Sequence, residues 1–303
     1  MKKKVLVIAG PTASGKTSFS IRLAKKLHGE VISGDSIQVY RGLDIGSSKV
    51  TEEEKQGVVH HLIDILDPKE PYSSFDFQRM ARELIDHEDF FPIIAGGTGL
   101  YLKACLYDYA FEKEDEKLPP ADPELESLSN EELWDLLLKT DPEQAQKLHP
   151  NNRRRVMRTL TIARRTGRKQ SELEKLQDHE MIYDAFIAGC TMERSVLYER
   201  INARVEQMFE NGLCEEVKGL LDSGVTFDDP GMRGIGYQEF REYFLGNRTL
   251  DEVKEEICRN SRHYAKRQYT WLNHQMPVHW FNVLEEADCQ RMEEEILSWA
   301  KEN

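Results

Sequence analysis

Short apolar runs alternate with amphipathic stretches through most of the chain. Val5–Ala9 is a continuous apolar run, which is typical of a buried strand, and Phe19, Leu23 and Leu27 then recur every four residues, which predicts a helix. By the same criteria we expect strands at 30–33, 60–66, 92–95, 185–189 and 278–281, and helices at 18–27, 75–88, 194–221, 249–273 and 285–301. Strands that alternate with helices predict an α/β fold with a doubly wound parallel sheet.

The alternation stops in one internal segment. From residue 113 to residue 182 only helical patterns occur, at 131–139, 142–148 and 152–166, after a proline-rich linker at Leu118–Pro123. We therefore predict an α/β core formed by residues 1–112 and 183–303, with a small all-helical domain inserted at 113–182.

The net charge of −13 by itself argues against a nucleic-acid partner, but the charges are unevenly distributed along the chain. Residues 112–143 hold twelve acidic side chains against three lysines, whereas residues 151–169 hold eight basic side chains and no acidic one. Arg154, Arg155, Arg158 and Arg165 lie close to one helical face, where a solvated face would normally mix both signs. The segment predicts a local polyanion site, with a plain solvent-exposed face as the alternative.

Cysteine usage and hydropathy bear on location. The five cysteines are scattered and form no C-x-x-C pair, which is typical of reduced thiols and argues against a structural zinc site. No apolar run approaches the roughly 20 residues that span a bilayer, and no signal peptide precedes the first strand. We expect a cytoplasmic protein without a membrane partner, and a monomer.

The stretch Gly10–Thr17, GPTASGKT, joins the first strand to the first helix. In this context G-x-x-x-x-G-K-[ST] predicts a P-loop, whose backbone N–H groups and helix N-terminus hold a polyphosphate. Lys16 is expected on the terminal phosphate oxygens, and the Thr17 hydroxyl on a magnesium ion bound to them.

Other polar residues are expected at the same sheet edge. Asp35 follows the second strand and the glycine-rich turn 96–99 follows the fourth, and ligands collect where parallel strands end. Arg200 and Arg204 share one helical face, so either surface ion pairing or phosphate contact is open to them. We interpret His60 and His61 as structural, because neighbours in a strand point to opposite faces.

Two enzymes and a non-enzyme fit these features. A P-loop small-molecule kinase that binds ATP explains the cradle and the carboxylate. An enzyme that holds an RNA on its basic helices and a diphosphate leaving group in its cradle also explains the arginines. A non-catalytic RNA binder switched by a nucleoside triphosphate is the third candidate.

The order of motifs resembles that of the tRNA dimethylallyltransferase (tRNA isopentenyltransferase) family of bacterial type. The matching stretches are GPTASGKT (10–17), SGDSIQVYRGLDIGSSK (33–49), HHLIDILDP (60–68), GGTGLY (96–101), RRVMRTL (154–160), LYERINARVEQMFENGLCEEV (197–217), GIGYQEF (234–240) and the helix 262–271. The resemblance covers nearly the whole chain and implies transfer of a dimethylallyl group from dimethylallyl diphosphate to the exocyclic amine of the adenosine 3′-adjacent to the anticodon.

The resemblance also implies roles for individual residues. Asp35 is expected to be the general base, with Lys16, Thr17, Mg²⁺ and either Arg200 or Arg204 opposing the charge of the departing diphosphate. The diphosphate site is expected to comprise Gly10, Pro11, Thr12, Ala13, Ser14, Gly15, Lys16 and Thr17. Contacts to the anticodon stem-loop of tRNA are expected from Asp35, Ser36, Ile37, Gln38, Thr98, Arg154, Arg155, Val156, Met157 and Arg158.

Overall fold

The chain divides into two compact units. The computed structural model describes residues 2–87, 89–109, 122–175 and 180–302. Unit 1 contains the chain up to Tyr107 and from Met181 onward, and unit 2 is Asp108–Glu180. Residues 118–121 of the predicted linker lie outside the described ranges.

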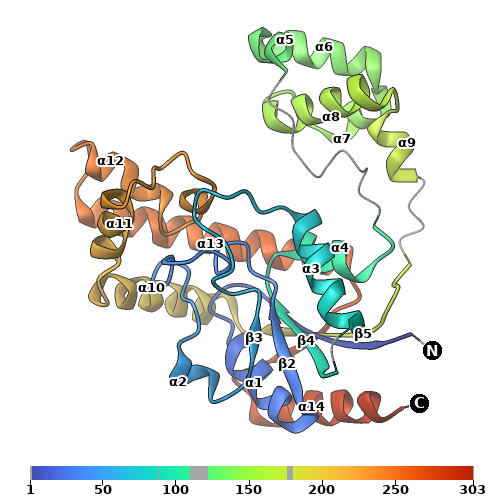
Figure 1. The fold of residues 1–303 in the computed structure, drawn as a ribbon, viewed down its shortest axis with the longest axis vertical. Helices are drawn as coiled ribbons and strands as arrows, with labels where there is room; N and C mark the ends of the chain where they lie inside the picture. The colour runs from blue at the N-terminus through green and yellow to red at the C-terminus, as the bar shows by residue number, and fades with distance from the viewer. Residues whose placement is uncertain (1, 88, 110–121, 176–179, 303) are drawn as a thin grey trace. The chain divides into compact units, whose positions relative to one another are not determined.

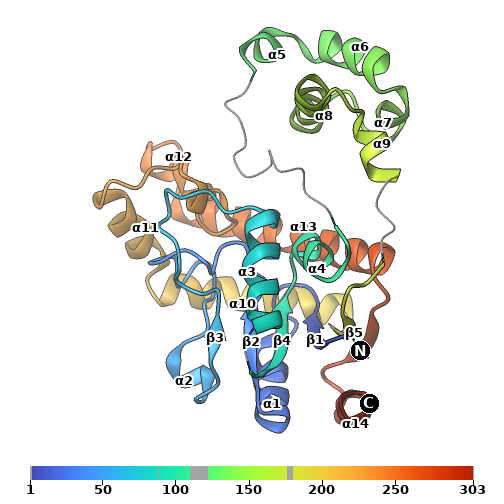
Figure 2. The ribbon, with the colours of Figure 1, turned by 45° about the vertical axis from the view of Figure 1, so that its right-hand side comes forward.

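Unit 1 is built on a six-stranded sheet in which every neighbouring pair is parallel, with strand order β3-β2-β4-β1-β5-β6 (Figures 1 and 2). The strands are β1 (Lys4–Ala9), β2 (Gly29–Ser33), β3 (His60–His61), β4 (Phe91–Gly96), β5 (Asp184–Thr191) and β6 (His279–Asn282). β1 lies between β4 and β5, so the loop that follows it emerges near the middle of the sheet edge.

Helices cover both faces of this sheet, which confirms the doubly wound α/β fold. Val5 and Val7 of β1 point into one core, and Leu6 and Ile8 point into the other, because alternate side chains of a strand face opposite sides. The first core is covered by α3 (Ser74–His87), α4 (Gly99–Leu106) and the C-terminal half of α13 (Leu250–Gln275), and the second by α1 (Lys16–Leu27) and α14 (Glu286–Lys301).

The third strand is shorter than the predicted strand 60–66. Leu62 and Asp64 have φ values of 61° and 56°, in the left-handed region, so the backbone leaves the sheet directly after His61. Further along, Tyr40 and Leu66 form a single parallel bridge. The predicted strand 60–66 is therefore a partly buried segment, with only Leu62 fully inside, rather than a continuous strand.

The predicted helix 194–221 is two helices, α10 (Arg194–Glu210) and α11 (Leu213–Asp222). Gly212 separates them with φ 92°, a conformation that glycine adopts without steric cost. A third core joins α10 and α11 to the loop after β2 and to η2 (Pro230–Arg233), η3 (Gln238–Phe240), α12 (Arg241–Phe244) and the first half of α13. α2 (Glu52–Lys55) follows that loop and begins at a capping box on Thr51.

Within its described residues, unit 2 is helical: α5 (Pro123–Ser127), α6 (Asn130–Thr140), α7 (Pro142–Lys147), α8 (Arg153–Thr166) and α9 (Gln170–Lys175). Leu133, Leu137, Val156 and Leu160 form the centre of its own hydrophobic core. Buried Asp141 joins two helices of this unit, because its carboxylate accepts hydrogen bonds from Gln144 N and from both N and Oγ of Ser171.

Across the described ranges, we find no helix with the length and apolar character needed to cross a bilayer. All five cysteines are free thiols, three of them buried.

Candidate active site

The P-loop, Gly10–Thr17, curls between the end of β1 and the start of α1. Gly10 has φ 143° and Gly15 has φ 86°, both positive values that L-side chains rarely adopt. A Cβ on Gly10 would lie 2.7 Å from the carbonyl oxygen of Cys190, at the end of the neighbouring strand. Glycine is therefore required at the point where the loop turns toward the helix N-terminus.

Lys16 extends along this loop rather than into solvent. Its Nζ donates a hydrogen bond to the Pro11 carbonyl at 2.6 Å, and it lines a cavity of about 110 Å³ together with Thr12 and Thr17. Burial lowers the pKa of Lys16 to about 8, against the opposing effect of Asp35. An anion in the cavity would favour the charged ammonium and raise that pKa again.

The two candidate arginines of α10 have different positions. Arg204 is half-buried, lines the same cavity, and donates from Nε to Ser48 Oγ at 2.6 Å and from Nη1 to Thr12 Oγ1 at 3.5 Å. Burial lowers the pKa of Arg204, and the negative charge of Asp35 opposes this effect. Arg200 is exposed and lines a wider groove of about 530 Å³, which also contains Gly15 and Arg204. Arg204 is thus the arginine that hydrogen-bonds to a P-loop side chain, whereas Arg200 shares an open groove with the loop.

Asp35 lies where β2 ends and lines the cavity with Lys16 and Arg204. Its Oδ1 accepts hydrogen bonds from Ile37 N at 2.8 Å and Gln38 N at 3.2 Å. Among the described residues nothing donates to its Oδ2. One carboxylate oxygen therefore anchors the turn, and the other remains available to accept a proton.

The remaining residues predicted to contact RNA in unit 1 lie beside Asp35 or at the start of α4. Gln38 lines the cavity, and its Nε2 donates to the Ser47 and Ser48 carbonyls at 3.3 and 3.2 Å. Ser36, Ile37 and Thr98 are half-buried.

Gln268, a buried residue of α13, is a cavity residue that no pattern in the sequence predicts. Its Oε1 accepts a hydrogen bond from Thr12 N at 2.9 Å, and it lines the cavity with Tyr264. Burial raises the pKa of the Tyr264 hydroxyl, and the charge of Asp35 raises it further. The only local signal was an amide among the basic residues of a long helix, which indicates nothing about a distant P-loop.

In unit 2, the arginines of α8 differ in their surroundings. Arg154, Arg155, Arg158 and Arg165 are exposed and form no ion pair with any residue that the structure describes. Arg153 instead donates to the carbonyls of Leu125, Glu126 and Leu128 and so closes the end of α5.

The position of Val156 in α8 contradicts the expectation that its side chain contacts the tRNA. Val156 is 1% exposed in the core of unit 2, because it lies on the apolar side of that helix, so its side chain cannot contact an RNA. Met157 is half-buried and packs against the same core. The exposed side chains of this stretch are therefore those of the neighbouring arginines.

The donor set beside the P-loop suits Mg²⁺. Thr17 offers an exposed hydroxyl at the start of α1, and Asp35 lines the cavity with it. No group of three or more His, Cys, Asp or Glu side chains among the described residues could hold a metal ion. Mg²⁺ usually takes one or two protein ligands together with substrate phosphate oxygens and water, which fits this sparse set.

A glycine-rich loop at the edge of a parallel sheet, with Lys16 and Arg204 directed at it, defines a P-loop-type α/β protein. The model of the family described as IPP transferase matches residues 38–275, and that of Isopentenyl transferase matches residues 3–65. The chain therefore belongs to the tRNA dimethylallyltransferase family, whose members are prenyl-transferring enzymes.

Individual relatives match over nearly the full length. The tRNA dimethylallyltransferase of Anoxybacillus flavithermus is 47% identical, over 99% of this chain and 96% of its own, and that of Bacillus subtilis is 44% identical, over 98% and 96%. The crystal structure of a tRNA isopentenylpyrophosphate transferase from Bacillus halodurans superposes with a TM-score of 0.74 at 44% identity, covering 99% of this chain and 97% of that one. A eukaryotic dimethylallyltransferase acting on tRNA gives a TM-score of 0.83 at 31% identity, covering 98% and 80%.

Proposed function

We propose that the protein transfers the dimethylallyl group of dimethylallyl diphosphate to the exocyclic amine of the adenosine 3′-adjacent to the anticodon of a tRNA. One observation carries this proposal: Asp35, Lys16 and Arg204 line a single cavity beside the P-loop. A base and a cationic phosphate site are then within one small volume, as a displacement of diphosphate by an amine requires.

The step is a substitution at the allylic carbon. The bond from that carbon to the diphosphate oxygen breaks, the bond to the adenosine nitrogen forms, and diphosphate leaves with the electron pair. The amine is a weak nucleophile because its lone pair is delocalised into the ring, and it must lose a proton as the new bond forms. The free Oδ2 of Asp35 is the proposed acceptor of that proton.

Cationic groups stabilise the leaving group. Lys16 Nζ, the Arg204 guanidinium and the N-terminus of α1 oppose the charge that develops on the diphosphate. Arg200, which is exposed, is proposed to oppose the same charge from the outer groove. When bound, Mg²⁺ held by Thr17 and the phosphate oxygens supplies further charge neutralisation.

RNA binding is divided between the units. Gln38 is proposed to recognise the target adenine through Oε1, because its Nε2 hydrogens already donate to the Ser47 and Ser48 carbonyls, and Thr98 is proposed to contact the RNA nearby. The exposed Arg154, Arg155 and Arg158 are proposed to bind phosphates of the anticodon stem, contacts that position an RNA without reading its sequence. We expect a monomer that acts on tRNA in the cytoplasm.

The test supplies labelled dimethylallyl diphosphate, Mg²⁺ and unmodified tRNA, and looks for label in the RNA. We expect label at one adenosine and release of diphosphate. Consumption of ATP with no label in the RNA would contradict the proposal and favour a kinase.

A further inference from the structure

A glutamate outside the cavity holds the loop between β2 and α2. Glu216 of α11 accepts hydrogen bonds at Oε2 from Asp44 N at 3.0 Å and Ile45 N at 2.7 Å, and at Oε1 from Gly46 N at 3.2 Å. Hydrogen bonds to an ionised acceptor are roughly twice as strong as neutral ones. Three successive N–H groups on one carboxylate therefore define the backbone path of this loop.

Tyr237 completes this contact. Its hydroxyl donates to Glu216 Oε1 at 2.8 Å, and its side chain is fully buried. The ring packs against Gly46, where a Cβ would lie 2.5 Å from Tyr237 Cζ. We call Glu216, Tyr237 and Gly46 the loop clamp.

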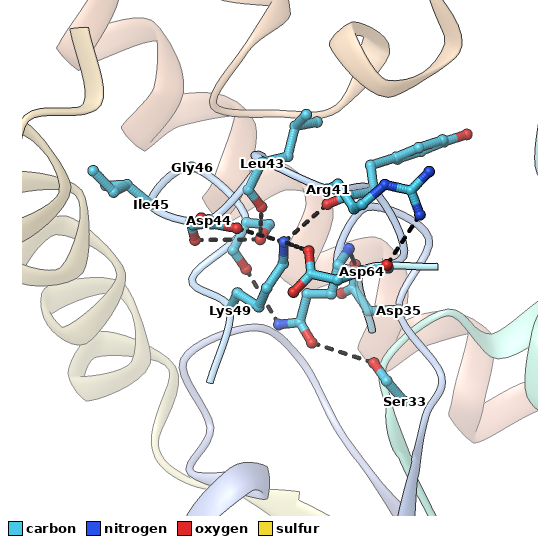
Figure 3. Close-up of polar contacts among 12 residues, drawn as sticks. Ser33, Asp35, Arg41, Leu43, Asp44, Ile45, Gly46, Lys49 and Asp64 are labelled. Atoms are coloured by element: carbon cyan, nitrogen blue, oxygen red, sulfur yellow. Dashed lines mark hydrogen bonds and ion pairs between the residues drawn. The ribbon is translucent and has the colours of Figure 1, made fainter. Parts of the chain in front are cut away.

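Lys49 is a second charged side chain that holds the same loop (Figure 3). Its Nζ donates to the Tyr40 carbonyl at 2.8 Å and pairs with Asp44 Oδ1 and Asp64 Oδ1 at 2.5 Å each. The Lys49 side chain is only 6% exposed although its two partners are largely exposed. Charged side chains thus hold the loop at residues 44–46 and again through Lys49.

The clamped loop contacts two residues of the cavity. The Ser47 and Ser48 carbonyls accept from Gln38 Nε2, while Ser33 Oγ donates to Gln38 Oε1 at 3.2 Å. Two carbonyls on one side and a hydroxyl on the other give the Gln38 amide a defined orientation. The Ser48 hydroxyl accepts from Arg204 Nε at 2.6 Å.

We propose that Glu216 is a positioning residue that, through the loop clamp, sets the orientation of the Gln38 amide and thereby the recognition of the target base. Glu216 does not itself line the cavity or the groove. Its effect passes along the backbone from Gly46 to the Ser47 and Ser48 carbonyls. This inference rests on the proposed function, because it assigns Gln38 to the base.

The test compares Glu216→Gln with Glu215→Gln. An amide at position 216 sets an NH₂ group against a backbone N–H. Glu215 is the exposed neighbour, and its side chain forms no hydrogen bond or ion pair with any described residue. We expect kcat/KM for tRNA to fall about 10- to 100-fold in Glu216→Gln, the range for hydrogen bonds to charged groups, and to stay unchanged in Glu215→Gln.

A double-mutant cycle with Gln38→Ala separates positioning from a general loss of stability. If Glu216 acts through Gln38, Glu216→Gln has little further effect once Gln38 is alanine, since coupled residues are non-additive. Equal losses in both backgrounds would overturn the proposal, as would wild-type kinetics in Glu216→Gln. Tyr237→Phe keeps the ring against Gly46 and removes only the hydroxyl, so it provides the same cycle if Glu216→Gln does not fold.

Measuring tRNA binding in the absence of dimethylallyl diphosphate distinguishes this proposal from the proposed function. We expect wild-type protein to bind tRNA with adenosine at the target position more tightly than tRNA with guanosine there, and Glu216→Gln to lose that preference. A wild-type protein that neither binds nor modifies tRNA refutes the proposed function. A wild-type preference that persists unchanged in Glu216→Gln refutes the clamp alone.

Discussion

Thr12 in the P-loop donates its backbone N–H to Oε1 of Gln268 in α13, at 2.9 Å across 256 positions of sequence. Gln268 also packs against Gly97, where a Cβ would lie 2.2 Å from Gln268 Nε2. One buried amide therefore joins the loop after β1, the turn after β4 and the long helix α13.

Gln268→Ala is predicted to weaken diphosphate binding. It removes the partner of the Thr12 N–H, and a lost hydrogen bond of about 0.5–1.5 kcal/mol corresponds to a few-fold to tenfold rise in KM for dimethylallyl diphosphate. Steady-state kinetics measures this rise. Thr270→Ala, an exposed change two residues further along the helix, serves as the control. An unaltered KM in Gln268→Ala would show that this contact does not organise the P-loop.

Asp35→Asn is predicted to abolish most of the chemistry while tRNA binding persists. Asparagine can still accept from the Ile37 and Gln38 N–H groups, but it cannot take a proton from the amine. We expect single-turnover transfer to slow about 10²–10⁴-fold. Asp35→Ala also frees the turn and should weaken tRNA binding as well. Near-normal transfer by Asp35→Asn would remove Asp35 from the role of base.

The lowered pKa of Lys16 predicts that diphosphate binding depends on pH. Its pKa of about 8 in the free protein means that the ammonium is partly deprotonated above that pH. Because bound diphosphate favours the ammonium, binding takes up protons there, and affinity falls as pH rises through about 8. Calorimetry at pH 8.5 in buffers of different ionisation enthalpy measures the uptake. Lys16→Met should bind about 10- to 100-fold more weakly and lack this component. Equal uptake by both proteins would assign the protons elsewhere.

The exposed arginines of α8 predict a salt dependence of tRNA binding. Each lost phosphate contact reduces the slope of log K against log salt by about 0.7–0.9, so alanine at Arg154, Arg155 and Arg158 should reduce it by about 2. Filter binding at several salt concentrations measures this slope. Arg164→Ala is the matched control, because Arg164 already pairs with Asp122 and Glu124. A slope that falls as much in the control would argue against specific phosphate contacts.

Local patterns in the sequence were sufficient for most of the strands and long helices and for the P-loop. Strand runs, helical periodicity and the positions of Gly10, Gly15, Lys16 and Thr17 depend on residues close together in the chain, so they can be recognised without the fold. The run 60–66 was misleading because burial alone does not distinguish a strand from a turn in left-handed conformations. Gly212 likewise ended a helix whose apolar positions continue past it.

The amino-acid sequence by itself determined the parallel α/β architecture, the polyphosphate loop and the basic helix, since each follows from short-range spacing and charge. Only the tertiary structure decided that Arg204 rather than Arg200 hydrogen-bonds to Thr12, that Val156 is buried, that Gln268 binds the P-loop and that Glu216 binds the loop after β2. These facts depend on contacts between residues far apart in the chain. The packing of helices on the sheet creates such contacts, and no local pattern of residues encodes them.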